Sequence, residues 1–350
     1  MRISDALGND SLYVCPARAK TPTLLAGWSR DARGEREIRI FPGYRWILVI
    51  EPDSLVQKVH VYASNGTELF SAACRGVPMP AGRDYVLWPD TISAAFDSPT
   101  LQLRRLPSAE VRATWIAAAG YGAAAQLENF IAVNLAASVD PATGIRQDVL
   151  RLFDLEGKEL WTRALRADYH DFSVSNFGDV AIARERALRV YDRSGAERFH
   201  APIPVNLIGR TAMGSDGRFV LVAARAAGLG RPVGDLWLAL YDTKRRASVW
   251  DRRDLSDRPG ADPLEISVSD DGGRALVRLS SGSVLLLGRD GSLVARFDLP
   301  RVPNGESQPG VVPRRTWLSP DGGRVALTTP VARSFAEARG WLYDVPLQPR

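Results

Sequence analysis

The chain has 350 residues, 45% of them hydrophobic and 24% charged, proportions that are typical of a globular protein. Its net charge is only +5, and all but four of its 45 basic residues are arginine, as in proteins of GC-rich bacterial genomes, so charge argues weakly for nucleic-acid binding. The start, MRISDALGND, does not read as a secretory signal, and the apolar stretch at 115–125 is too short to span a bilayer. Cys15 and Cys74 form neither a metal-binding nor a disulfide pattern. We therefore expect a cytoplasmic bacterial protein without a cofactor or membrane contact.

Residues 1–35 contain two segments with strand character, SLYVCPA at 11–17 and TLLAGWS at 23–29, and precede a region of repeats. One repeated pattern is an alternating strand, a tight turn with Asp, Asn or Gly, and a dense apolar strand. It occurs as VSNFGDVAIA (174–183), MGSDGRFVLV (213–222), VSDDGGRALV (268–277) and LSPDGGRVAL (318–327). Asp and Ser bond the backbone N–H groups of such turns and Gly accepts a positive φ, so each copy predicts a β-hairpin.

A second hairpin follows each of these and completes a unit of four strands, named a to d. Its copies are VHVYASNGTELF (59–70), LRLFDLEGKELW (150–161), LRVYDRSGAERF (188–199), looser versions at 101–112, 238–250 and 284–297, and a final half-copy at 341–350. One position on strand c marks each unit and is held by Tyr62, Arg104, Phe153, Tyr191, Tyr241, Leu287 and Tyr343. The spacings of 42, 49, 38, 50, 46 and 56 residues define seven units, with the period of a β-propeller.

Strand b is expected to be buried on both faces, because segments such as RFVLVAA (218–224) and WILVIE (46–51) are apolar throughout. The segment 123–138 also fits a helix, but the phase of the repeats places a b strand at 129–137, and we adopt the phase. The sequence therefore predicts an all-β fold, a seven-bladed β-propeller of four-stranded antiparallel blades. It forms one domain over 1–350, with 1–35 as an N-terminal lead-in and 36–350 as the repeats.

Two of these segments resemble known repeats. WLSPDGGRVALTT (317–329) resembles the WD40-type repeat in the variant where Pro-Asp-Gly follows the first strand, and LFDLEGKELWTRAL (152–165) resembles the outer hairpin of the quinoprotein-like (PQQ-like) repeat. The resemblance extends over about residues 36–345 and is faint in the second unit. It implies a β-propeller fold and says little about function.

The last unit stops after strand c and would leave an unpaired edge. We predict that residues 11–17 supply its fourth strand and join the two ends of the chain. Residues 23–29 are the alternative.

The two ends of the strands are expected to carry connections of different length. The a–b and c–d turns span a few residues, whereas the long segments are b–c or d–a connections, namely 89–99, 138–147, 225–235, 252–263, 300–315 and 330–339. Long loops on a rigid scaffold often carry binding sites. We therefore place binding at the b–c/d–a end, near the mouth of the central channel.

The candidate binding residues follow from this placement. The arginines at that end suit an acidic protein segment or a phosphate backbone, and they are Arg225, Arg231, Arg252, Arg253, Arg258, Arg314 and Arg315. A further candidate is the d–a segment DYHD, with Asp168, Tyr169 and His170, where a carboxylate beside a histidine can tune a base or hold a metal. No second histidine is near in the sequence, so a structural or plain surface role is favoured for DYHD.

We expect a non-catalytic scaffold that binds a protein partner through the b–c/d–a end, and we assign no catalytic residue and no metal ligand. One alternative is a propeller-type hydrolase or lactonase whose polar groups converge on the channel mouth. The other is a nucleic-acid-binding propeller. The identity of the partner and the oligomeric state do not follow from the sequence.

Overall fold

The computed structural model is built from β-strands throughout the residues that it describes. These are residues 2–4, 10–14, 23–28, 37–40, 46–51, 57–63, 67–74, 78–81, 84–92, 99–116, 124–126, 129–139, 146–166, 171–184, 186–204, 207–228, 231–253, 255, 261–297, 315–328 and 340–344. Within these residues, no helix has the length and hydropathy needed to cross a membrane.

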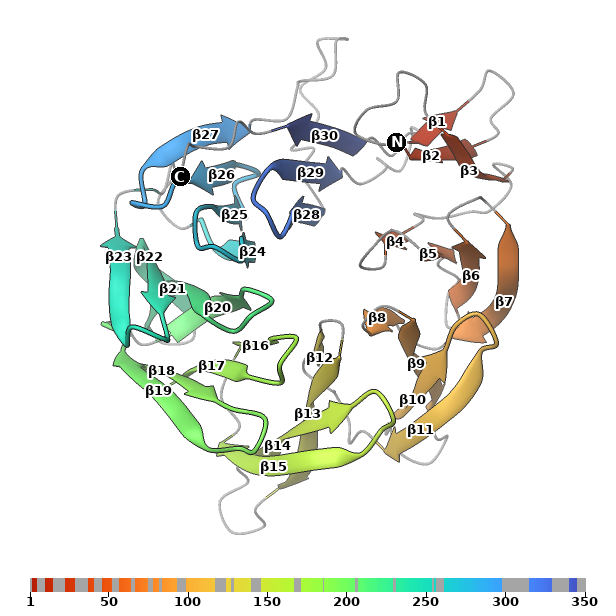
Figure 1. Ribbon diagram of the computed structural model, residues 1–350, viewed down its shortest axis with the longest axis horizontal. Coiled ribbons are helices and arrows are strands. Elements are labelled where there is room, and N and C mark those ends of the chain that lie inside the picture. Colours follow the sequence, from red (N-terminus) through yellow and green to blue (C-terminus); the bar gives the residue numbers. More distant parts are fainter. Residues whose placement is uncertain are drawn as a thin grey trace. The chain divides into compact units, whose positions relative to one another are not determined.

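The chain divides into two compact units, Met1–Ala167 with Val331–Gly340 and Asp168–Pro330 with Trp341–Arg350. Four sheets lie in the first unit, with their strands in chain order (Figure 1). They are β1 (Arg2–Ser4), β2 (Asp10–Val14), β3 (Thr23–Trp28); β4 (Glu37–Ile40), β5 (Trp46–Glu51), β6 (Gln57–Ala63), β7 (Glu68–Cys74); β8 (Met79–Ala81), β9 (Tyr85–Ile92), β10 (Pro99–Arg105), β11 (Glu110–Ile116); and β12 (Ala124–Gln126), β13 (Phe130–Val139), β14 (Arg146–Asp154), β15 (Glu159–Arg166).

The second unit has the same organisation and contains three sheets of four strands and most of one sheet of three. They are β16 (Asp171–Val174), β17 (Val180–Arg184), β18 (Ala187–Tyr191), β19 (Glu197–Pro202); β20 (Leu207–Met213), β21 (Phe219–Gly228), β22 (Arg231–Asp242), β23 (Ala247–Arg252); β24 (Pro263–Val268), β25 (Ala275–Leu279), β26 (Val284–Leu287), β27 (Leu293–Phe297); and β28 (Arg315–Leu318), β29 (Arg324–Thr328), β30 (Gly340–Asp344). The first strands of successive sheets are neighbours, β16 beside β20, β20 beside β24 and β24 beside β28 (Figure 1).

The predicted phase of the repeats is confirmed. All seven marker residues, from Tyr62 to Tyr343, lie on the third strand of a sheet, and the ambiguous segment at 129–137 is strand β13 rather than a helix. The second strand β25 is buried on both faces as expected, since every one of its side chains is buried. Turn chemistry and alternating hydrophobicity are local signals, and they were sufficient to place these hairpins.

The N-terminal region differs from the prediction. The described residues form eight sheets, and the additional one is the sheet β1–β2–β3. Strand β2 (residues 10–14), which overlaps the predicted strap at 11–17, pairs with β1 on one edge and with β3 on the other. A strand with both edges paired has none left for the last blade, so closure by residues 11–17 is not confirmed. Within the described residues, the last repeat contributes three strands, β28 to β30.

The hydrophobic core lies between successive sheets. One cluster joins β16–β19 to β20–β23 and includes Phe199, Trp237 and Tyr241. Another joins β20–β23 to β24–β27 and includes Phe219 and Trp250. The sheet β20–β23 is thus covered on both faces by its neighbours, which explains why its second and third strands read as continuous apolar runs.

The a–b turns of the second unit are joined to one another by hydrogen bonds. The backbone N–H of Asn176 donates to the carbonyl of Ser215 at 2.8 Å, and the N–H of Ser215 donates to the Asp270 carboxylate at 2.7 Å. The N–H of Asp270 in turn donates to the carbonyl of Pro320 at 2.8 Å. These contacts connect four successive a–b turns, so this end of the sheets is held rigidly in register.

The predicted loop at 225–235 is largely a β-ribbon. Strand β21 continues to Gly228 and β22 begins at Arg231, with Gly228 opposite Arg231 and a register shift between Ala224 and Ala226. The strands β9, β13 and β14 likewise extend into the loops predicted at 89–99 and 138–147. These extensions contain glycine, proline and charged residues and show no regular hydrophobic alternation, so the sequence pattern did not reveal them.

Candidate functional site

Three of the predicted arginines have described side chains, and their surroundings differ. Arg225 is buried, with 3% of its side chain exposed, and its Nη1 lies 3.3 Å from Oδ1 of Asp262. Arg252 is half-buried and its Nη1 donates to the carbonyl of Gly291 at 3.3 Å. Arg253 is exposed directly after β23. Arg225 therefore lies in the packing of its sheet, while Arg253 faces solvent.

The remaining candidates are not placed in the same detail. Arg231 and Arg315 begin strands β22 and β28, and their side chains lie outside the described part of the structure. Asp168, Tyr169, His170, Arg258 and Arg314 lie outside the described residues altogether. A partner-binding role for these seven residues stays a prediction.

The acid that ends the DYHD segment, Asp171, connects two sheets. Its carboxylate accepts the backbone N–H of Thr211 at 2.6 Å, and Arg210 lies 3.5 Å away. Burial raises the pKa of Asp171 against the opposing effect of these contacts. Glu265 of β24, two sheets further along, makes the same contact to β28, where it accepts the N–H of Thr316 at 2.7 Å. An acid on one first strand thus bonds the first strand of the next sheet, which is a structural role.

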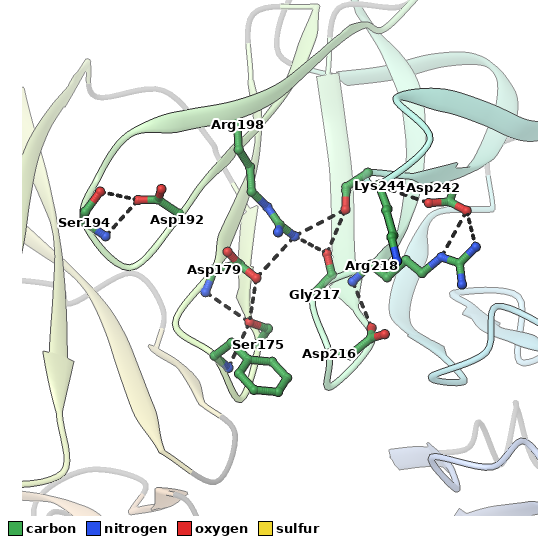
Figure 2. Close-up of polar contacts among 12 residues, drawn as sticks. Ser175, Asp179, Asp192, Ser194, Arg198, Asp216, Gly217, Arg218, Asp242 and Lys244 are labelled. Atoms are coloured by element: carbon green, nitrogen blue, oxygen red, sulfur yellow. Dashed lines mark hydrogen bonds and ion pairs between the residues drawn. The ribbon is translucent and has the colours of Figure 1, made fainter.

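Figure 2 shows a polar network at the turn end of the sheets β16–β19 and β20–β23. Arg198 of β19 lies at its centre: its Nη2 is 3.2 Å from Oδ2 of Asp179, and it donates to the carbonyl of Gly217 at 2.6 Å and to Thr243 Oγ1 at 3.2 Å. Asp179 also accepts a hydrogen bond from Ser175 Oγ. One guanidinium therefore joins the a–b turn of its own sheet to both turns of the next sheet.

Two aspartates in the network shape the c–d turns. Asp242 accepts Nε and Nη2 of Arg218 at 3.1 and 2.8 Å, and its other oxygen accepts the backbone N–H of Lys244 at 3.0 Å (Figure 2). Asp192 accepts the N–H and the hydroxyl of Ser194 at 2.8 and 2.6 Å. The pKa of Asp192 is lowered, chiefly by the Ser194 hydroxyl. Both aspartates directly follow a marker residue, so their role was readable from the repeat.

A hollow of about 420 Å³, here called the turn pocket, opens within this network. It is lined by Phe177, Asp179, Asp192, Arg193, Ser194, Arg198 and Asp216. Phe177 is 64% exposed. Burial raises the pKa of Asp179, and the charges of Asp192 and Asp216 act in the same direction. The pocket combines three carboxylates with two arginines and is suited to polar contacts.

A second hollow, here called the lateral groove, has a volume of about 440 Å³ and lies between β19 and the strands β22 and β23. It is lined by Phe199, His200, Ala201, Pro202, Pro204, Trp237, Tyr241, Arg246, Ala247, Ser248, Asp251 and Arg253. Phe199, Trp237 and Tyr241 are nearly buried, whereas His200 and both arginines are exposed. The groove therefore has an apolar base and a charged rim.

The base of the lateral groove is fixed by one hydrogen bond. The Tyr241 hydroxyl donates to the carbonyl of Pro202 at 3.3 Å. Burial, with a further contribution from the Asp251 charge, raises the pKa of Tyr241 to about 12. The hydroxyl therefore keeps its proton and remains a donor over the physiological pH range.

The sequence did not reveal either hollow or the role of Arg198. Two partners of Arg198, Gly217 and Thr243, belong to a different repeat, 19 and 45 residues away along the chain, and no local spacing predicts such a contact. A weak signal for the groove was available in HAPIP (200–204), since two prolines end an outer strand there. Within the described residues, no group of three or more His, Cys, Asp or Glu side chains is arranged to hold a metal ion.

Known proteins resemble this chain in fold and not in sequence. No family model matches the chain, and no curated protein matches it. The C-terminal WD40 domain of Sif2 is similar in structure, with a TM-score of 0.60 and 11% identity over 97% of this chain and 90% of that chain. BamB of Moraxella catarrhalis has a TM-score of 0.54 and 12% identity, over 94% of this chain and 95% of that chain. Hsv2 of Kluyveromyces lactis has a TM-score of 0.55 and 11% identity, over 84% of this chain and 90% of that chain.

These neighbours include WD40 propellers and a propeller of PQQ-like repeats, the two repeat types that the sequence resembles. At such low identity the likeness concerns the fold alone. From its repeated four-stranded antiparallel sheets and these neighbours, the chain has a β-propeller fold of the kind seen in WD40 and PQQ-like repeat proteins.

Proposed function

We propose that this protein is a non-catalytic scaffold that binds a partner protein through the b–c/d–a end of its sheets. The observation that carries the proposal is the contrast between the two ends. The a–b turns of the second unit, such as 175–179 and 319–323, are tight and hydrogen-bonded to their neighbours. The strands β23 and β24, β27 and β28, and β29 and β30 are separated by 253–262, 298–314 and 329–339.

Rigid sheets with long connections at one end suit a binding platform, because the connections can vary without disturbing the packed core. Exposed Arg253 begins one of these connections, and the prediction that arginines contribute to binding stays part of the proposal. The cytoplasmic location and the bacterial origin also stay predictions.

The test compares two variants of the full chain. In the loop-end variant, residues 300–313 and 330–339 are replaced by Gly-Ser segments of equal length. The control carries Lys158→Ser, Arg193→Ser and Arg289→Ser, which change exposed residues of the c–d turns at the opposite end. Both are first checked by thermal unfolding, and captured proteins are then purified and titrated against each variant.

We expect a partner protein that binds the loop-end variant at least tenfold more weakly than the unmodified protein and binds the control with unchanged affinity. Equal loss in both variants, or loss only in the turn-end control, would refute it. Affinity for DNA or RNA that falls steeply with salt would support the nucleic-acid alternative instead.

We also infer that the seven repeats act as seven blades of one ring, completed by an N-terminal strand. The position of the marker residues on seven third strands supports the count of repeats. Deletion of residues 1–35 tests the closure: the midpoint of thermal unfolding of the whole chain should fall by several degrees. An unchanged midpoint would contradict it.

A further inference from the structure

The lateral groove is bordered by the edge of a sheet. Strand β19 is the last strand of its sheet among the described residues, and four consecutive residues of it, 199–202, line the groove. Successive side chains of a strand point to opposite faces, so four in a row place the backbone itself along the groove. An edge strand offers unpaired N–H and C=O groups to an added strand.

The hydrogen bonds of β19 show which groups face outward. Ile203 donates its N–H to Arg186 beside β18 at 2.6 Å, and Pro202 directs its carbonyl to Tyr241 in the groove. Because the backbone groups of an antiparallel edge strand alternate in direction, those of His200 point away from β18, as the carbonyl of Pro202 does. His200 therefore presents a donor and an acceptor at the groove.

The rim carries a cation at each end of β23. Arg246 precedes this strand and Arg253 follows it, and both are exposed. Neither has an ion-pair or hydrogen-bond partner within the described part of the chain, unlike Arg218, Arg225 and Arg278, which pair with acids. The two arginines flank the six residues of β23, so at a rise of about 3.3 Å per residue an extended peptide must be roughly 20 Å long to reach both of them.

We propose that the lateral groove binds an extended segment of a partner protein, added as a strand to the edge of β19, with one carboxylate at each end to meet Arg246 and Arg253. Asp251 lies between the two arginines and selects an uncharged or hydroxyl side chain at the centre of the segment. This surface is distinct from the loop connections of the proposed function and shares only Arg253 with it.

The probe is the peptide Glu-Ser-Val-Ser-Thr-Ser-Glu, labelled with rhodamine at its N-terminus and amidated at its C-terminus, and its binding to the full chain is followed by fluorescence anisotropy. A matched peptide has Lys in place of both Glu residues. A second matched peptide is N-methylated at alternate residues, which removes the donors that an added strand needs. We expect the N-methylated peptide and the Lys peptide to bind at least tenfold more weakly.

The variants Arg246→Glu and Arg253→Glu reverse the charge at one end of the groove each. We expect each to weaken binding of the Glu peptide about tenfold, and to bind the Lys peptide more tightly than the unmodified protein does. The control is Arg289→Glu, which makes the same charge change at an exposed turn outside the groove. Thermal unfolding of all three variants confirms that they are folded.

A spectroscopic readout locates the peptide. Trp237 lines the groove, and its indole Nε1 has no hydrogen-bond partner within the described residues. Its N–H resonance, assigned with Trp237→Phe, should shift on addition of the Glu peptide. Three results would overturn the proposal: no binding of the Glu peptide, equal binding of the N-methylated peptide, or self-association of the protein that occupies the groove and is abolished by Arg253→Glu.

Discussion

Arg198 and Gly217 join two successive sheets: Nη2 of Arg198 on β19 donates to the carbonyl oxygen of Gly217, in the turn between β20 and β21, at 2.6 Å. The same nitrogen lies 3.2 Å from the carboxylate of Asp179, and the Asp179 side chain is only 8% exposed. The network of Figure 2 therefore combines a contact between sheets with the neutralisation of a nearly buried charge.

Replacing Arg198 by Ala should lower the free energy of unfolding by about 2 kcal/mol, because it leaves a nearly buried carboxylate without its cation. Urea denaturation measures the change. Arg189→Ala is the matched control, since Arg189 pairs with Glu197 on the surface, with side chains 50% and 36% exposed. Such surface pairs contribute about 0.5 kcal/mol or less. Equal effects of the two substitutions would show that Arg198 is an ordinary surface residue.

Gly217 permits a second test of this network. Its φ is +73°, and a Cβ at this position would overlap the Asp179 carboxylate. Gly217→Ala should therefore lower the unfolding free energy by about 1–3 kcal/mol. Gly214 in the same turn has no positive φ, and its Cβ would come no closer than 3.5 Å to Asp270. Gly214→Ala should thus be tolerated, and comparable destabilisation by both would contradict this account.

The repeats could be predicted from the sequence because their signals are local. Asp192 and Asp242 follow a marker residue directly and cap their turns, and Ser269 accepts the N–H of Arg274 within one turn at 2.9 Å. Such contacts join residues two to five positions apart, a distance over which composition and spacing are informative.

The candidate site was less predictable because it depends on contacts between repeats. The sequence predicts Arg225 to be a loop residue, yet strand β21 extends past it. Its side chain forms an ion pair with Asp262, which lies in the connection between β23 and β24. The lateral groove likewise needs residues of two sheets, near positions 200 and 250. A single sequence shows neither the length of paired strand extensions nor the partner of a side chain from a different repeat.

The stability of the protein should depend on Asp242 in a pH-dependent way. Burial opposes ionisation of this carboxyl, but the hydrogen bonds from Arg218, Arg245 and Lys244 outweigh burial and lower its pKa from 3.8. A lowered folded-state pKa contributes stability above the unfolded value, and this contribution is lost as the pH falls through the folded value. Asp242→Asn should therefore cost about 2 kcal/mol at pH 7, and the cost should shrink below pH 4.

Urea denaturation of both proteins from pH 7 to pH 2.5 measures this difference. Asp216→Asn serves as the control, because Asp216 is exposed and, among the described residues, accepts a single backbone N–H, from Arg218, which an amide oxygen also accepts. A difference between wild type and Asp242→Asn that stays constant with pH would show that the charge of Asp242 is not what stabilises its turn.

Substituting Arg225 and Arg253 in turn should distinguish an arginine with a structural role from an arginine that binds the partner. The Arg225 side chain is 3% exposed and its partner Asp262 is 33% exposed, so Arg225→Ala removes packing and leaves a partly screened carboxylate. We expect a loss of about 2 kcal/mol in unfolding free energy, less than for a fully buried pair. Arg253→Ala, at an exposed position, should change stability by about 0.5 kcal/mol or less. Paired urea denaturation and peptide titration check both residues. A stable Arg225→Ala protein that binds its partner more weakly would reverse the assignment, because it would show that Arg225 reaches the surface when the partner is bound.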